Sequence, residues 1–337
     1  MVSLKTIAQK CGVSTATVSK ALNDQKDISE ETKNRIRKTA ESLGYFPNAA
    51  ARALKTNRSH NLGVLFEEEA GRGLTHEYFS GVLNGLKVQA EKLDYDITFI
   101  NTCFENRKMS YYEHCRYRNF DGVAIVCADY NDPDVLELMN GDLPVVTVDY
   151  VHHNCTAVIS NNIQGIESLV RYIYGQGHRK IAYIHGQDSS YVTKDRLASF
   201  YRTMDELGLE VPDEYIRTAD YLETKEAARQ TREILNLPDV PTCIIYPDDT
   251  ALIGGRNVII EMGLRIPKDI SVAGYDGTRM SQLLHPKLTT IKQDTELIGR
   301  EAANRLISAI EKPRTTLVER VVIEGTLIPG QSVGQMK

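Results

Sequence analysis

Residues 4–22 read LKTIAQKCGVSTATVSKAL, and this stretch predicts two short helices joined by a tight turn. Apolar residues recur at helical spacing in its first half and stop at Gly12, which readily adopts the positive φ that ends a helix. Ser14 then provides a favourable N-cap for the second helix. In that helix Val18 and Leu22 face inwards, whereas the opposite face carries small and polar groups. A helix pair of this kind is typical of proteins that insert the second helix into the major groove of DNA.

The residues around this pair predict a small, basic, all-helical head. Ser29 can cap a third helix that has Ile36 and Ala40 on its apolar face. Residues 1–58 contain 11 Lys and Arg against 5 Asp and Glu, so they carry +6 and the rest of the chain carries −11 of the total of −5. A basic head on an acidic body suits a protein whose head alone binds phosphate.

The sequence changes character after residue 46. Pro47 forces the residue before it into an extended conformation, and residues 49–55 then have high helix propensity but are too few to be helical alone in water. We therefore predict a helix-turn-helix domain at 1–46 and a hinge at 47–61. The hinge would consist of a helix that forms only in contact with a partner, followed by a polar linker. A third region, 62–337, forms the body.

In the body, apolar strands alternate with helical stretches. The predicted strands are 62–66, 97–101, 122–126 and 145–149, then 180–185, 242–246 and 271–275. The predicted helices are 78–93, 107–118 and 133–140, then 162–175, 192–207, 224–236 and 249–262. Such alternation predicts parallel sheets covered on both faces, and its two runs predict two α/β lobes, at 62–159 and 160–288. A helix at 294–311 and a strand at 317–324 follow, and the sequence leaves open whether residues 289–337 cross back to the first lobe.

Ligands of open parallel sheets bind beyond the carboxyl ends of the strands, so we expect a binding site in the cleft between the two lobes. The composition excludes other classes of protein. The chain has 337 residues, of which 42% are hydrophobic, but it contains no apolar run of about 18 residues and no apolar signal core. We therefore expect no membrane partner and a cytoplasmic location. Six cysteines lie far apart without the spacing of metal ligands, so we interpret them as buried thiols and predict neither a metal site nor a cofactor.

Short motifs are spread in order over the whole chain. They are IA at 7–8, GVSTATVSKALN at 12–23, LGYFPNAAARAL at 43–54, GH at 177–178, RLASF at 196–200, GLRIP at 263–267, SVAGYD at 271–276 and LTTI at 288–291. Together they resemble the motifs of the lactose repressor (LacI) and galactose repressor family of transcription regulators. The resemblance implies a dimeric repressor with a body similar to periplasmic sugar-binding proteins. A ligand of that body would change the affinity for a palindromic double-stranded DNA operator.

The resemblance also implies which residues contact DNA. Thr15, Ala16 and Lys20 match the base-reading positions of the family, and Leu54 matches the hinge leucine that enters the minor groove and kinks the operator. Ala16 can meet a thymine methyl group but cannot make a bidentate contact with adenine. An apolar wedge such as Leu54 costs unstacking energy but lets the duplex bend onto more protein. The predicted set is completed by Thr17 and Asn48.

Seven residues match positions that line the family's sugar cleft: Tyr78, Phe79, Asp149, Arg196, Tyr221, Asp248 and Asp276. Carboxylates and a guanidinium can pair with vicinal hydroxyls while aromatic rings stack on the apolar face of a sugar, so a small sugar effector is expected. Two purely structural roles compete with this assignment. Asp249 ends the same predicted strand as Asp248 and belongs to the same cleft-lining site of the family, but it could simply cap the next helix. One of Tyr78 and Phe79 should face the core, because adjacent helical positions point about 100° apart.

Two other functions remain as alternatives. An enzyme on the same scaffold is disfavoured, because residues 276–278 only superficially resemble an aspartyl-phosphate loop and the chain has no nucleophile elbow, no phosphate-binding loop and no His pair at metal spacing. A purine-like corepressor or a partner protein could take the place of the sugar, since Arg196 and Asp276 fit a base equally well. An anionic effector is disfavoured if the acidic residues 67–69 line the cleft.

Overall fold

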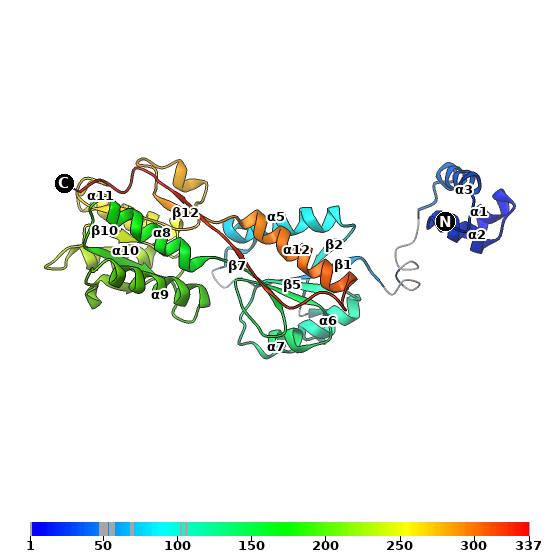
Figure 1. The fold of residues 1–337 in the computed structure, drawn as a ribbon, viewed down its shortest axis with the longest axis horizontal. Coiled ribbons are helices and arrows are strands. Elements are labelled where there is room, and N and C mark those ends of the chain that lie inside the picture. Colours follow the sequence, from blue (N-terminus) through cyan, green and yellow to red (C-terminus); the bar gives the residue numbers. More distant parts are fainter. Residues whose placement is uncertain are drawn as a thin grey trace. The chain divides into compact units, whose positions relative to one another are not determined.

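The structure is a computed structural model, and it describes residues 2–46, 53, 58–67, 71–101, 103–104 and 107–336. The chain forms two compact units, Met1–Ser59 and His60–Lys337, which are described separately below. We call them the head and the body. Figure 1 shows the helices of the head, and it shows the body as two lobes that each contain a sheet.

The head is built from α1 (Leu4–Cys11), α2 (Thr15–Leu22) and α3 (Glu30–Ser42). Each helix begins at a serine N-cap, and Gly12 ends α1 with a φ of 64°. The three helices meet around Ile7, Val18 and Ile36, whose side chains are fully buried. The predicted helix pair and the predicted third helix are therefore confirmed.

The first lobe contains a six-stranded parallel sheet. Its order is β13 (Arg320–Ile323), β7 (Thr156–Ser160), β6 (Val145–Val148), β5 (Gly122–Cys127), β1 (Asn61–Phe66) and β2 (Asp96–Phe99). Side chains of β5 alternate between the two faces, because Ala124 and Val126 join one core cluster and Val123 and Ile125 join another. The first face is covered by α5 (Glu77–Lys92) and α12 (Thr295–Glu311), and the second by α6 (Tyr111–Arg118) and α7 (Pro133–Asn140).

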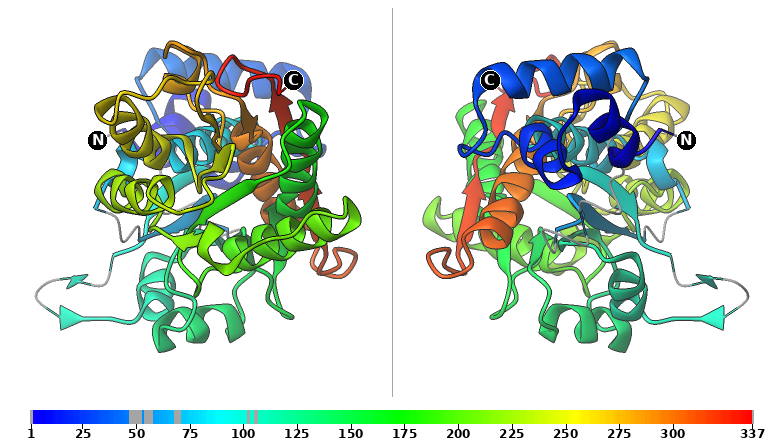
Figure 2. Two further views of the ribbon diagram at one scale, coloured as in Figure 1. Left: turned by 90° about the vertical axis from the view of Figure 1, so that its left-hand side faces the viewer. Right: turned by 90° about the vertical axis from the view of Figure 1, so that its right-hand side faces the viewer.

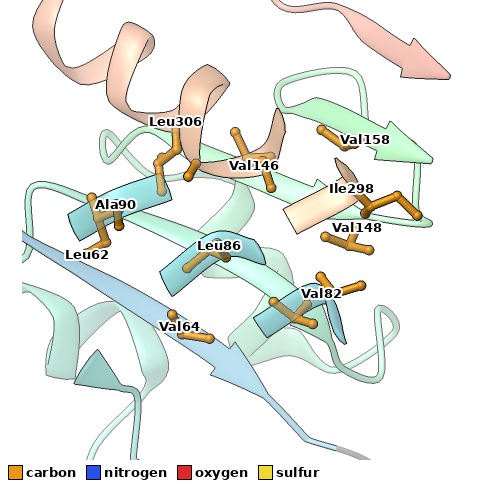
Figure 3. Close-up of a cluster of buried hydrophobic side chains, with 14 of the residues drawn as sticks. Leu62, Val64, Val82, Leu86, Ala90, Val146, Val148, Val158, Ile298 and Leu306 are labelled. Atoms are coloured by element: carbon orange, nitrogen blue, oxygen red, sulfur yellow. The ribbon is translucent and has the colours of Figure 1, made fainter. Parts of the chain in front are cut away.

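Figure 3 shows the core of the first face, where Leu86 of α5 and Leu306 of α12 lie near Val64 and Val146 of the sheet. The two covering helices also pack closely on each other. A Cβ atom added to Gly85 would lie 2.2 Å from the carbonyl oxygen of Glu296, and one added to Gly299 would lie 2.0 Å from that of Val82. The α5–α12 contact therefore requires glycine on both helices.

The second lobe contains a four-stranded parallel sheet, in the order β11 (Ser271–Ala273), β10 (Cys243–Ile245), β8 (Ile181–His185) and β9 (Ile216–Thr218). One face packs on α8 (Asn162–Gly175) and α9 (Tyr191–Glu206), the other on α10 (Thr224–Leu235) and α11 (Asp249–Glu261). A small antiparallel sheet pairs β12 (Thr290–Lys292) with β14 (Thr326–Ile328). Short 3-10 helices lie at Gly73–Thr75, Asp213–Tyr215 and Met280–Gln282.

The chain passes between the lobes three times. It leaves the first lobe after β7, returns between β12 and α12, and leaves again between β13 and β14. The last described residues stay on the second lobe, because Val333 joins its core and the Ser332 hydroxyl donates to the carbonyl of Val272 at 2.7 Å. The helix predicted at 294–311 is confirmed as α12, and β13 is shorter than the strand predicted at 317–324 and lies in its second half.

One predicted helix begins too early. Within residues 107–118, Arg107–Lys108 form β4, which pairs antiparallel with β3 (Cys103–Phe104) in a hairpin that projects from the first lobe (Figure 2). The helix α6 starts only at Tyr111, because Ser110 and Glu113 form a reciprocal capping box. Strands β7, β9, β12 and β14 were not predicted, and each is at most five residues long.

The cysteine interpretation is correct only in part. Cys115, Cys155 and Cys243 are buried, but Cys11 and Cys127 are partly exposed. Among the described residues, no group of three or more His, Cys, Asp and Glu side chains could hold a metal ion. No helix in the described part of the chain is long and apolar enough to cross a membrane.

Candidate functional site

The outward face of α2 carries the residues that were predicted to read DNA. Thr15 and Ala16 are exposed at its first turn. Thr17 is half-buried, and its hydroxyl lies 2.9 Å from that of Ser14, the N-cap. Ala16 is therefore free to contact DNA, whereas Thr17 already has a hydrogen-bond partner.

Lys20 lies on the same helix, but its ammonium group forms an ion pair with the exposed carboxylate of Asp27. The hydrogen bond from Lys20 lowers the pKa of Asp27 below its ordinary value. A surface ion pair contributes little free energy, so a phosphate or a base could replace Asp27 at small cost. Two further predicted DNA contacts, Asn48 and Leu54, lie outside the described residues, as does most of the predicted hinge.

In the body, all seven residues that were predicted to line the ligand cleft surround one cavity of about 320 Å³. They are Tyr78, Phe79, Asp149, Arg196, Tyr221, Asp248 and Asp276. The cavity lies where the strands of both lobes end at their carboxyl termini, because Asp149 directly follows β6 and Tyr221 comes shortly after β9.

Arg196 lines this cavity, and the protein holds its side chain in one orientation. It projects from α9 with only 3% of its surface exposed. Its Nε donates to Oδ1 of Asn162 at 2.8 Å, and its Nη1 donates to the carbonyl of Pro247 at 2.9 Å. The guanidinium also lies 3.5 Å from the ring centroid of Tyr275. Burial opposes its charge, but Tyr221, Tyr275 and Asp276 raise the pKa of Arg196 above its ordinary value, so the group stays cationic.

Asp149 faces the cavity from the end of β6. Its backbone has a φ of 52°, and its Oδ1 accepts a hydrogen bond from the amide of Ser160 at 2.8 Å. The hydroxyl of Tyr78 donates to the other oxygen. Burial raises the pKa of Asp149 above its ordinary value, although this hydrogen bond opposes the shift. Tyr78 is thus the member of the Tyr78–Phe79 pair that is buried, and Phe79 packs against Phe66 with ring centroids 5.4 Å apart.

Asp248, and not Asp249, caps α11. Oδ1 of Asp248 accepts from the amides of Thr250 and Ala251, both at 2.8 Å, and its Oδ2 accepts from the amide of Leu222 at 2.8 Å. Three hydrogen bonds to backbone leave this carboxylate little capacity for a ligand, so its main role is to hold the loop beside Tyr221. The expectation that Asp249 might be the cap is wrong, because Asp249 is the first residue of the helix and accepts from the amide of Thr278 at 2.7 Å.

Asp276 shares the cavity with Gln293, which was not predicted. The side-chain amide of Gln293 donates to Oδ1 of Asp276 at 2.7 Å. Within the described chain, the carbonyl oxygen of that side chain is buried without a hydrogen-bond partner. Gln293 directly follows β12, and because this short strand was not predicted, the rule that ligands bind at strand ends did not point to Gln293. It offers an unused acceptor to a ligand hydroxyl.

Three tyrosines of the cavity wall were also missed. The rings of Tyr130 and Tyr150 stack in parallel, with centroids 3.7 Å apart and an interplanar angle of 3°. The ring of Tyr191 meets Tyr150 edge-on at 5.0 Å. Tyr130 and Tyr150 follow β5 and β6; no residue was predicted for the site after β5, and only Asp149 was predicted after β6.

The cavity is strongly acidic. Among the described residues that line it, one guanidinium, that of Arg196, faces five carboxylates, which belong to Glu67, Asp129, Asp149, Asp248 and Asp276. Whether the acidic residues 67–69 line the cleft was left open by the sequence; of the three, only Glu67 is described, and it lines the cavity. An anionic ligand would meet net repulsion here.

In the described part of the chain, the hydrogen bonds that cross the cleft from lobe to lobe include those of Glu77 and Arg72. Oε1 of Glu77, on α5, accepts from the amide of Arg279 at 2.7 Å. Nη2 of Arg72 donates to the carbonyl of Leu222 at 3.4 Å. Both bonds must adjust when the lobes change their relative orientation, so they contribute to the energy of opening the cleft.

Comparison with known proteins gives matches to both units. Residues 3–48 match the family model of bacterial regulatory proteins, lacI family, and residues 170–333 match that of the periplasmic binding protein-like domain. The HTH-type transcriptional repressor PurR of Escherichia coli O139:H28 (strain E24377A / ETEC) is 30% identical over 333 residues, which cover 96% of each protein.

Two solved structures are similar over nearly the whole chain. One is the Lac repressor dimer bound to operator and the anti-inducer ONPF, with a TM-score of 0.81, 25% identity and 99% of each chain covered. The other is a complex of the transcriptional regulator CelR with cellobiose, with a TM-score of 0.69, 25% identity, and 98% of this chain and 100% of that chain covered.

Proposed function

This chain belongs to the LacI family of bacterial regulatory proteins and is a DNA-binding transcriptional regulator, and we propose that it is a repressor whose effector is an uncharged sugar bound between the lobes. The observation that carries the sugar proposal is the combination of fixed polar groups and aromatic rings around one cavity. Arg196 and the free carbonyl of Gln293 offer a donor and an acceptor that are already oriented. Tyrosine and phenylalanine rings beside them suit the apolar face of a sugar.

The charge of the cavity also indicates whether the ligand is neutral or charged. Five carboxylates against one guanidinium disfavour a sugar phosphate and favour a neutral polyol. The complex of CelR with cellobiose provides an example of a similar chain that binds a sugar. We further propose that the chain acts as a homodimer on a palindromic operator in the cytoplasm, without catalysing a reaction, as its relatives are transcriptional regulators.

We propose that regulation works through the orientation of the lobes. A ligand that contacts Asp149 on one lobe and Arg196 on the other binds one orientation better and shifts the population towards it. The hydrogen bonds of Glu77 and Arg72 across the cleft would be remade in the process. The predicted hinge helices of the dimer would respond by packing on the minor groove or by separating. This response would couple the binding free energy of the effector to that of the operator.

The test is a ligand panel followed by operator binding. Neutral sugars, their phosphate esters and nucleobases are each screened by thermal shift on the full-length protein, and operator affinity is measured again with every hit. A neutral sugar that stabilises the protein and changes operator affinity is expected. Stabilisation by a nucleobase and by no sugar would overturn the sugar proposal in favour of a purine-like corepressor. Chemical conversion of the sugar, detected by mass spectrometry, would contradict a pure binding function.

A further inference from the structure

Two groups of residues with different chemistry line the cavity. In the first group, Arg196, Asp248 and Gln293 are each less than a tenth exposed and are held by hydrogen bonds to the protein. In the second group, Tyr191 is 55% exposed, and it meets the stacked pair of Tyr130 and Tyr150. Arg196 and Gln293 of the first group can pair with the hydroxyls of a sugar ring, and the second group offers mainly aromatic surface.

We call Tyr130, Tyr150 and Tyr191 the aromatic wall, and hydrogen bonds hold the first two of these residues in place. The hydroxyl of Tyr130 donates to the carbonyl of Val148 at 3.2 Å, and the hydroxyl of Thr147 donates to the carbonyl of Tyr150 at 2.6 Å. These bonds anchor both residues to β6 and the turn after it. A preorganised aromatic surface loses little conformational entropy when a ligand covers it.

The wall also spans both lobes. Tyr130 and Tyr150 come from the first lobe, and Tyr191 is the first residue of α9 in the second. A ligand that reaches the wall therefore contacts each lobe at a second place, beyond the contacts it makes with Asp149 and Arg196.

We propose that the effector is a glycoside with two units, in which one sugar ring binds to Arg196 and Gln293 and a second ring lies against the wall of Tyr130, Tyr150 and Tyr191. This inference rests on the proposed sugar-binding function and specifies the size of the ligand. A cavity of about 320 Å³ is within the range of roughly 300 to 1,000 Å³ that is usual for ligands of drug size. The tyrosine faces match the C–H face of a pyranose or an aromatic aglycone.

The experiment compares ligands of one and two units on wild-type and variant proteins. Glucose, galactose and mannose, and disaccharides that contain each of them, are titrated calorimetrically into the full-length protein. The wild type should bind one disaccharide at least tenfold more tightly than any of the hexoses. In Tyr191→Ala the affinity for this disaccharide should fall roughly five- to tenfold, as expected for one aromatic contact, while any measurable hexose affinity stays constant.

Tyr201→Ala is the matched control, because Tyr201 is also an exposed tyrosine of α9 but does not line the cavity. It should bind both classes of sugar like the wild type. A hexose that binds as tightly as every disaccharide would overturn the two-unit ligand and leave the sugar-binding function standing. An equal loss of hexose and disaccharide affinity in Tyr191→Ala would do the same. The absence of binding by every sugar would overturn both proposals.

Discussion

Arg196 is a buried, charged side chain whose orientation is fixed by its neighbours. Two hydrogen bonds and the face of Tyr275 fix the plane of its guanidinium before any ligand arrives. A long side chain that is already ordered loses little rotamer entropy on binding. The same environment makes the residue costly to remove, because Asn162 and the carbonyl of Pro247 would lose their partner.

We expect Arg196→Ala to abolish the response of operator binding to the effector while operator binding itself persists. Operator affinity measured with and without the effector tests this expectation. Arg202→Ala is the matched control on the same helix, since Arg202 is exposed and pairs with the carboxylates of Glu167 and Glu206. A response that survives in Arg196→Ala would exclude Arg196 from the binding site.

A second prediction at this scale concerns pH. Burial, followed by the charge of Asp276, raises the pKa of Asp249 from 3.8 to about 8. The folded protein then holds this proton more tightly than the unfolded chain, so its stabilising effect is complete below about pH 4 and is lost as the pH rises towards 8.

In Asp249→Asn this loss should disappear, because the amide resembles the protonated carboxyl but does not titrate. The free energy of unfolding of the wild type should fall relative to that of the variant by up to about 1.4 kcal/mol per pH unit within this window. Urea unfolding of both proteins between pH 4.5 and 8.5 measures the difference. Parallel curves would show that Asp249 has an ordinary pKa.

At the scale of elements, the contact between α5 and α12 ties the C-terminal part of the chain to the first lobe. Glycines on both helices let the backbones approach, and Leu86 and Leu306 extend the contact into the core. Because Gln293 lies just before α12, this contact also fixes the end of the segment that brings Gln293 to the cavity.

We predict that Gly299→Ala destabilises the body by roughly 1 to 3 kcal/mol, the usual cost of overpacking, because its Cβ would lie 2.0 Å from the carbonyl oxygen of Val82. Gly175→Ala in α8 provides the comparison, since a Cβ there meets no atom within 4 Å. The midpoint temperatures of thermal unfolding of the two variants should differ by several degrees. If both unfold at the temperature of the wild type, the helices have room to move apart.

At the scale of the whole molecule, the two units differ in net charge, because the head is basic and the body is acidic. The head carries the positive charge, and the acidic body contains the proposed effector site. A single α2 helix presents few polar groups to bases, since Ala16 is apolar and Lys20 is paired with Asp27. We therefore expect the specificity for the operator to come from the two heads of the proposed dimer and from the predicted hinge.

We expect Leu54→Gly to weaken binding to the specific operator much more than binding to unrelated DNA. Leu54 lies outside the described residues, and the expectation rests on its match to the minor-groove wedge of the family. Electrostatic contacts of the head supply most of the nonspecific affinity and remain intact. Titration of both DNAs at one salt concentration measures the two losses, and losses of equal size would contradict a wedge at this position.

The helices and strands that could be predicted from the sequence are those determined by residues close to one another in the chain. The serine caps and apolar periodicity of the head, and the long apolar strands of the body, needed no knowledge of distant contacts. Short strands such as β9 and β12 form only because a neighbouring strand pairs with them, so their sequences carry a weak signal. In the cavity, the charged residues stood out at strand ends, whereas Tyr130, Tyr150 and Gln293 resembled ordinary loop residues until the fold brought them together.

The triple passage of the chain between the lobes has a consequence for how the body can be divided. The first lobe is assembled from separate stretches of sequence, because α12 and β13 return to it after the whole sheet of the second lobe has been completed. A protease that cuts one connection therefore releases neither lobe, as two covalent links remain. For the same reason, exchanging the second lobe between two such regulators requires joints at all three connections, and a fusion at one point would combine parts of two incomplete sheets.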